Sequence, residues 1–121
     1  RWLEAHDVVN RARSAALEMI GPGIAAIEVD AVARAVIQDA GYGPAFVHGT
    51  GHGVGLEIHE SPKVSSRSDG QLEVGMVFTI EPGLYLEGEF GIRIEDMVCV
   101  TEDGCERLTT LEPEPMLRGT A

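Results

Sequence analysis

The chain has 121 residues, 44% of them hydrophobic, and its 20 acidic residues against 9 basic ones give a net charge of −11 with histidine neutral. This length predicts a single domain, and the hydrophobic content is too high for a disordered chain. No apolar run reaches the ~18 residues that a membrane helix needs, no secretory signal pattern is visible, and the negative charge argues against nucleic acid as a partner. We therefore expect a cytoplasmic protein with neither a membrane nor a nucleic acid as partner.

The two cysteines, Cys99 and Cys105, are too few for a disulfide framework, and their spacing is not that of a zinc site. We interpret them as free thiols in a reducing compartment; the alternative is a bridge across a tight hairpin. The first residue is Arg1 rather than Met. We therefore expect residues 1–121 to be part of a longer protein.

Two helices are predicted at the start of the chain, at residues 3–20 and 27–40, where apolar side chains recur at three- and four-residue steps. The sequence Gly21-Pro22-Gly23 ends the first helix, and Gly41 ends the second. Asp30 falls in the first turn of the second helix, where the helix dipole favours acidic residues.

Strands are predicted in the remainder of the chain. They cover residues 45–47, 77–80, 92–100 and 106–110, with a glycine-rich segment at 48–55, a polar surface loop at 63–70 and a hairpin turn at Asp103-Gly104. The order is two helices followed by an antiparallel meander. The fold class is therefore α+β, with helices on one face of a sheet.

Three of the four histidines, His48, His52 and His59, lie within twelve residues and among four glycines. Glycine lets the backbone approach a ligand closely, and imidazole is both a common metal ligand and a proton carrier near neutral pH. The cluster thus indicates a metal or catalytic site, and the alternative is a glycine-rich turn with incidental histidines.

Two carboxylates follow strand patterns. Glu81 comes directly after the apolar strand 77–80, so its charge needs a partner or a cation unless it faces solvent. Glu95 shares a strand face with Arg93, which suits either an ordinary ion pair or a metal ligand oriented by the guanidinium. One imidazole and two carboxylates suit manganese, cobalt or zinc, and bridging carboxylates could hold two ions ~3.5–4 Å apart that activate a water.

Three sequence blocks, at residues 48–62, 75–83 and 91–96, resemble in content and order the signature of the "pita-bread" metallopeptidases, family M24. Methionine aminopeptidases share the first two blocks. His48, four residues before His52, and the block Arg93-Ile-Glu95-Asp96 resemble more closely the Xaa-Pro branch, prolidase (Xaa-Pro dipeptidase) and aminopeptidase P. The resemblance implies the C-terminal half of a pita-bread catalytic domain.

The resemblance also implies roles for individual residues. His52, Glu81 and Glu95 would be metal ligands, with Glu81 also the general base and Glu95 bridging two ions. His48 and His59 would hold the substrate and the developing oxyanion, and Arg93 would steady Glu95. The implied reaction is hydrolysis of an Xaa-Pro peptide bond with two divalent cations, commonly manganese.

The chain departs from the family in lacking the block that carries two aspartate ligands, so it would supply three of five. No aspartate present, Asp30 and Asp96 included, is expected to replace them. We expect the chain alone to bind metal poorly, to be inactive or weakly active, and to associate, as a homodimer for example, through uncovered sheet surface. A non-catalytic binding module and a creatinase-type C–N hydrolase are the alternatives.

Overall fold

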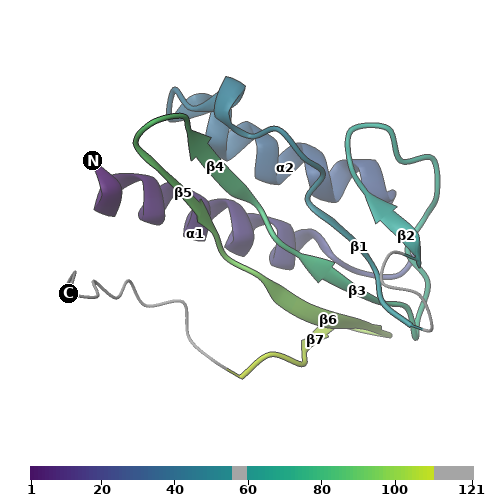
Figure 1. Ribbon diagram of the computed structural model, residues 1–121. Helices are drawn as coiled ribbons and strands as arrows, with labels where there is room; N and C mark the ends of the chain where they lie inside the picture. Colours follow the sequence, from purple (N-terminus) through teal and green to yellow (C-terminus); the bar gives the residue numbers. More distant parts are fainter. Residues whose placement is uncertain (56–59, 111–121) are drawn as a thin grey trace.

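The structure is a computed structural model that describes residues 1–55 and 60–110. Its elements in chain order are α1 (Trp2–Met19), α2 (Ala26–Asp39), the short 3₁₀ helix η1 (Gly43–Ala45), and the strands β1 (Gly51–Gly53), β2 (Glu60–Val64), β3 (Val77–Ile80), β4 (Gly83–Leu86), β5 (Phe90–Arg93), β6 (Asp96–Thr101) and β7 (Gly104–Arg107). The helices pack against each other and lie behind the strands in Figure 1. The predicted α+β class is confirmed.

The larger sheet is antiparallel, with strand order β2-β1-β3-β6-β7, while β4 and β5 form a separate two-stranded sheet. Strand β1 pairs with β3 at Gly53↔Phe78, and β3 pairs with β6 from Val77↔Cys99 to Ile80↔Asp96. The start of β1, the end of β3 and the start of β6 therefore meet at one end of the sheet. That end carries the three predicted metal ligands.

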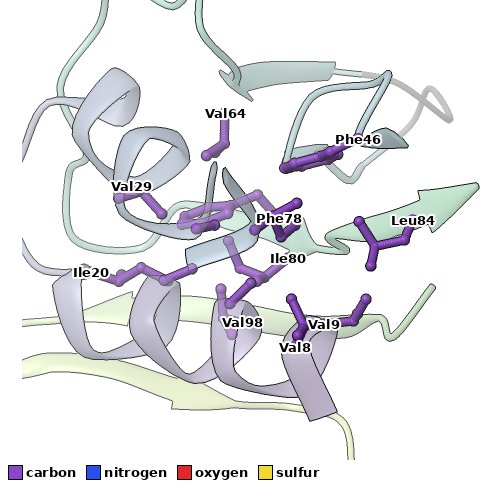
Figure 2. Packing of buried hydrophobic residues seen from close by; sticks show 14 of the residues in the cluster. Val8, Val9, Ile20, Val29, Phe46, Val64, Phe78, Ile80, Leu84 and Val98 are labelled. Carbon is purple, nitrogen blue, oxygen red and sulfur yellow. The ribbon is translucent and has the colours of Figure 1, made fainter. Parts of the chain in front are cut away.

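Apolar side chains from both layers fill the space between the helices and the strands. Val8 and Val9 of α1 and Val29 of α2 are buried with Phe78 and Val98 of the sheet, and Figure 2 shows these side chains gathered in one cluster. Burial of each such side chain contributes about 1.5–3 kcal/mol relative to leaving it exposed. The core thus stabilises the packing of the helices against the sheet that carries the predicted ligands.

Two predicted strands differ from the structure. Residues 45–47 do not form a strand, because Ala45 ends the short helix η1, which begins at Gly43, and Phe46 follows as extended backbone. The strand predicted at 92–100 is divided into β5 and β6, because Ile94 N–H donates to the Pro82 carbonyl and the chain then changes its partner from β4 to β3. Strands β1, β2 and β4 were not predicted: β1 falls in the glycine-rich segment, and β2 extends into the polar loop expected from residue 63.

The return strand predicted at 106–110 corresponds to β7, which begins two residues and ends three residues earlier than expected. The predictions for the helices and the cysteines agree with the structure. Both helices end one residue before the expected positions. The hairpin between β6 and β7 turns at Glu102-Asp103, one residue before the predicted Asp103-Gly104, because Gly104 already pairs with Thr101. Cys99 and Cys105 are both unbonded, and burial raises the pKa of the Cys105 thiol. Among the described residues, neither helix combines the length and the apolar character required to cross a bilayer.

Candidate functional site

His52 lies in the middle of β1, and hydrogen bonds hold both its backbone and its ring. Its amide N–H donates to Thr79 Oγ1 at 3.1 Å, and its ring Nδ1–H donates to the Gly53 carbonyl oxygen at 2.9 Å. Because a carbonyl oxygen can only accept, the neutral ring carries its lone pair on Nε2. That atom lies 3.8 Å from Glu81 Oε1. The imidazole thus has the tautomer and the support typical of a metal-binding histidine.

Glu81 follows β3 directly and its side chain is only 16% exposed. Burial raises the pKa of this carboxyl, and the nearby Glu95 carboxylate raises it further by its charge and by a side-chain hydrogen bond. The charges of His52 and Arg93 act in the opposite direction on that pKa. Glu81 therefore lies at the meeting point of a histidine, a second carboxylate and a guanidinium.

Glu95 lies in the break between β5 and β6, outside the strand in which it was predicted, and it is exposed. It lies close enough to Glu81 to raise the pKa of that carboxyl. Arg93, at the end of β5, lines with His48, His52 and Glu81 a hollow of about 520 Å³. The structure thus brings five of the six predicted site residues to one place.

His48 lies on the wall of this hollow. Its Nδ1–H donates to the Gly49 carbonyl oxygen at 2.7 Å, so its Nε2 accepts from the Tyr85 hydroxyl at 2.8 Å. Tyr85 comes from β4, and no local sequence pattern singled it out. The sixth predicted residue, His59, lies outside the described residues.

The most informative missed residues are Asp30 and Arg34 on α2. Asp30 is buried, and it accepts hydrogen bonds from Arg34 and from the backbone N–H and the hydroxyl of Thr50. Arg34 in turn donates to the carbonyl oxygens of Phe46 and His48. A signal was available, because Asp30 falls on the apolar face that contains Ala26, Ala33 and Ile37.

Gly51 explains one of the glycines in the 48–55 segment. A Cβ on Gly51 would lie 1.7 Å from the Thr79 carbonyl oxygen, so no other residue fits between β1 and β3. On either side of it, Thr50 accepts a hydrogen bond from Glu81 N–H at 2.6 Å and His52 faces the Glu81 carboxylate. Close contact of the two strands is thus what brings histidine and glutamate together.

The donor atoms at this site suit a divalent cation. Nitrogen from His52 and oxygen from Glu81 and Glu95 match manganese, cobalt or zinc, and a cation would offset the like charges of the two carboxylates. Over residues 1–55 and 60–110, however, no three His, Cys, Asp or Glu side chains lie together closely enough to enclose a metal ion. The residues thus fit a metal in kind, but the described side chains do not lie close enough together to enclose one.

Solved structures to which this chain is similar include peptidases. The chain superimposes with a TM-score of 0.89 and 50% identity on an X-Pro aminopeptidase from Thermotoga maritima MSB8, covering 92% of this chain and 32% of that one. With prolidase from Pyrococcus furiosus the TM-score is 0.88 and the identity 49%, over 90% of this chain and 32% of that one. The matching sheet and helices therefore define a peptidase-type catalytic fold.

The chain belongs to metallopeptidase family M24, whose model matches residues 2–102. Among curated relatives, a Xaa-Pro dipeptidase from Pyrococcus furiosus is 49% identical over 111 residues, which are 92% of this chain and 32% of the relative. The resemblance to the pita-bread metallopeptidases is thus confirmed. The chain spans about a third of the length of these relatives.

Proposed function

We propose that the protein hydrolyses Xaa-Pro peptide bonds with divalent metal, and that residues 1–121 supply part of its catalytic domain. The observation that carries this proposal is the meeting of Glu81 with His52 and Glu95 at one end of the sheet. The names of the relatives, Xaa-Pro dipeptidase and X-Pro aminopeptidase, supply the substrate class.

In this proposal His52, Glu81 and Glu95 are metal ligands. A divalent ion held there would lower the pKa of a bound water toward neutral pH and polarise the scissile carbonyl. Glu81 accepts the proton of the attacking water, and Arg93, on the wall of the same hollow, offsets the charge of the carboxylates. His48, oriented by Gly49 and Tyr85, holds the substrate, and His59 shares that task.

The finer features of the proposal are a pair of manganese ions and a cytoplasmic location. Mixed nitrogen and oxygen donors support manganese over a metal that prefers thiolates, and the two free cysteines support a reducing compartment. The proposal also includes association with a second copy, which size-exclusion chromatography tests.

The test of the proposed function is hydrolysis of Gly-Pro by the whole protein in the presence of Mn²⁺. We expect His52→Ala to abolish turnover while circular dichroism stays unchanged. His6→Ala, on α1 beside Trp2, is the matched control and should keep full activity. Retained turnover in His52→Ala would remove this residue from the site.

A second test concerns the incomplete ligand set. We expect isothermal titration of the chain alone with Mn²⁺ to give weak binding, because three protein ligands cannot fill the coordination shells of two ions. Tight binding at two sites would contradict this prediction.

A further inference from the structure

A buried ion pair on α2 lies beneath the glycine-rich segment of the site. Asp30 is only 1% exposed and accepts four hydrogen bonds: from Arg34 Nε at 2.9 Å, Arg34 Nη2 at 3.1 Å, Thr50 Oγ1 at 2.8 Å and Thr50 N at 3.2 Å. An ionised carboxylate is tolerated in such a place only when its oxygens are fully paired. Half of that pairing is directed at Thr50 rather than at the helix.

Arg34 extends the same contact along the chain. Its Nη1 donates to the Phe46 carbonyl oxygen at 3.2 Å and its Nη2 to the His48 carbonyl oxygen at 3.0 Å. The guanidinium also stacks on the Phe46 ring, 4.1 Å from the ring centre. Together Asp30 and Arg34 hold the backbone at residues 46, 48 and 50, which lead directly into β1.

The cluster reaches two of the three metal ligands proposed above, His52 and Glu81, through Thr50. Thr50 lies two residues before His52, and its carbonyl oxygen accepts from Glu81 N–H at 2.6 Å. A hydrogen-bonded path therefore runs from the Asp30 carboxylate through Thr50 to the backbone of Glu81. No atom of Asp30 needs to touch the metal for this path to set the spacing of the ligands.

Strand β1 needs such external support. It has three residues, it pairs with β3 only at Gly53↔Phe78, and its register with β2 shifts between His52 and Gly53. A strand this short makes few ladder hydrogen bonds of its own. A rigid helix that holds the preceding residues supplies the missing constraint.

We propose that Asp30 and Arg34 are positioning residues, which hold the segment 46–50 so that His48 and His52 face Glu81 in the geometry that metal binding and turnover require. This inference rests on the proposed function, because it concerns the same site. It assigns to an aspartate outside the ligand set, and to an arginine that no sequence block contains, a role that acts through Thr50.

The chain contains a matched control pair. Asp7 and Arg11 on α1 have the same four-residue spacing, and Arg11 Nε lies 3.0 Å from Asp7 Oδ2, close to the 2.9 Å of the Asp30–Arg34 pair. Their side chains, however, are 67% and 56% exposed. An exposed pair of this kind contributes little to stability. Asp7→Asn therefore repeats the chemistry of Asp30→Asn without touching the site.

The experiment uses the whole protein and four variants: Asp30→Asn, Thr50→Val, Thr50→Ser and Asp7→Asn. Three quantities are measured: Mn²⁺ affinity by isothermal titration, kcat and KM for Gly-Pro at saturating Mn²⁺, and the NMR signals of the His52 imidazole in the metal-free protein. Thr50→Val removes the hydroxyl donor at nearly constant shape, and Thr50→Ser restores it.

We expect Asp30→Asn to lose roughly 10- to 100-fold in Mn²⁺ affinity and in kcat, as is typical when a group that orients a ligand is removed. Thr50→Val should lose about tenfold in both, near the lower end of the range for such groups. Thr50→Ser and Asp7→Asn should match the wild type, and the His52 signals should shift only in the first two variants.

The proposal is overturned if Asp30→Asn and Thr50→Val bind Mn²⁺ and turn over like the wild type, or if Thr50→Ser fails as badly as Thr50→Val. Should Asp30→Asn not fold, the comparison of Thr50→Val with Thr50→Ser decides alone. A wild-type protein that neither binds Mn²⁺ nor cleaves Gly-Pro refutes the proposed function instead, and the NMR comparison still tests the positioning of His52.

Discussion

Two buried aspartates, each paired with arginine, lie close to the same end of the sheet, and they serve different parts of the molecule. Asp30 pairs with Arg34 on its own helix and shares its remaining hydrogen bonds with Thr50. Asp96, 2% exposed at the start of β6, pairs with Arg13 of α1 and with Arg107 of β7, the latter at 3.3 Å. One cluster is local and ends on a loop, and the other joins a helix to two strands.

The difference teaches that the partners of a buried charge, rather than its burial, indicate its role. Besides Arg34, the partners of Asp30 are the backbone N–H and the hydroxyl of Thr50, which lies between His48 and His52, so the loss of Asp30 should disturb the site. The partners of Asp96 are side chains from separate layers, one of them 83 residues away, so its loss should separate the layers. We expect substitution of Asp30 to reduce activity more than stability, and substitution of Asp96 to reduce stability more than activity.

The largest expected effect on stability is that of Asp96→Ala. Removing one partner of a buried ion pair leaves uncompensated charge and typically costs about 3–5 kcal/mol. Here two arginines lose their shared acceptor, so urea denaturation of the whole protein should show a loss of that size. Turnover per folded molecule should fall far less than in Asp30→Asn.

Asp7→Ala is the control for this measurement, because an exposed pair contributes only about 0.2–1 kcal/mol. Suppose that Asp96→Ala lost as much turnover as Asp30→Asn and that the two variants had the same free energy of unfolding. The two clusters would then have the same role. The contrast between them would then be wrong.

A smaller loss of stability is expected for Gly51→Ala, which disturbs only the side of the sheet that Asp30 supports. The new Cβ would lie 1.7 Å from the Thr79 carbonyl oxygen, so β1 must move away from β3. Overpacking of this kind costs about 1–3 kcal/mol. The displacement also separates His52 from Glu81, and Mn²⁺ affinity measured by isothermal titration should fall sharply.

Gly70→Ala is the matched control, because a Cβ at Gly70 would meet no atom within 4 Å. It should leave both stability and Mn²⁺ affinity unchanged. An equal loss of affinity in the two alanine variants would show that the tight contact at Gly51 is not what sets the site.

Much of the fold could be predicted from local patterns, because the two helices and the strands β3 and β6 each carry a regular apolar repeat. The same repeats could have revealed the buried charges. Arg13 lies among Val9, Ala12 and Ala16 on the apolar face of α1, and Asp96 occupies a buried position in the alternation of β6. A charge within an apolar stripe is costly unless it is paired, so it predicts a partner from another element.

Other features had no local signal. Strand β4 became visible only through its pairing with β5, and Tyr85 reaches His48 from 37 residues away. The break at Glu95 likewise depends on the Pro82 carbonyl oxygen, to which the preceding Ile94 N–H donates. Such long-range contacts decide where a strand ends and which residue enters a site, and a single sequence contains no record of the distances involved.

The smallest expected effect is the dependence of stability on pH that arises from Glu81. Its pKa in the fold is raised above the ordinary value of 4.5, first by burial and then by Glu95. A group with a raised pKa holds its proton more tightly in the folded state, so its contribution is present below pH 4.5 and is lost as the pH rises through the raised pKa. With a chelator present to remove metal, the whole protein should therefore lose some stability across this pH range, as measured by urea denaturation at a series of pH values.

Glu81→Gln should flatten this pH dependence of stability, whereas Glu87→Gln, on the neighbouring hairpin, should leave it unchanged. Saturating Mn²⁺ should also remove the pH dependence, because a cation favours the ionised carboxylates. If the pH dependence of stability persisted unchanged in Glu81→Gln, it would arise from other groups. Glu81 would then lack the unfavourable buried charge that makes this end of the sheet suited to a metal.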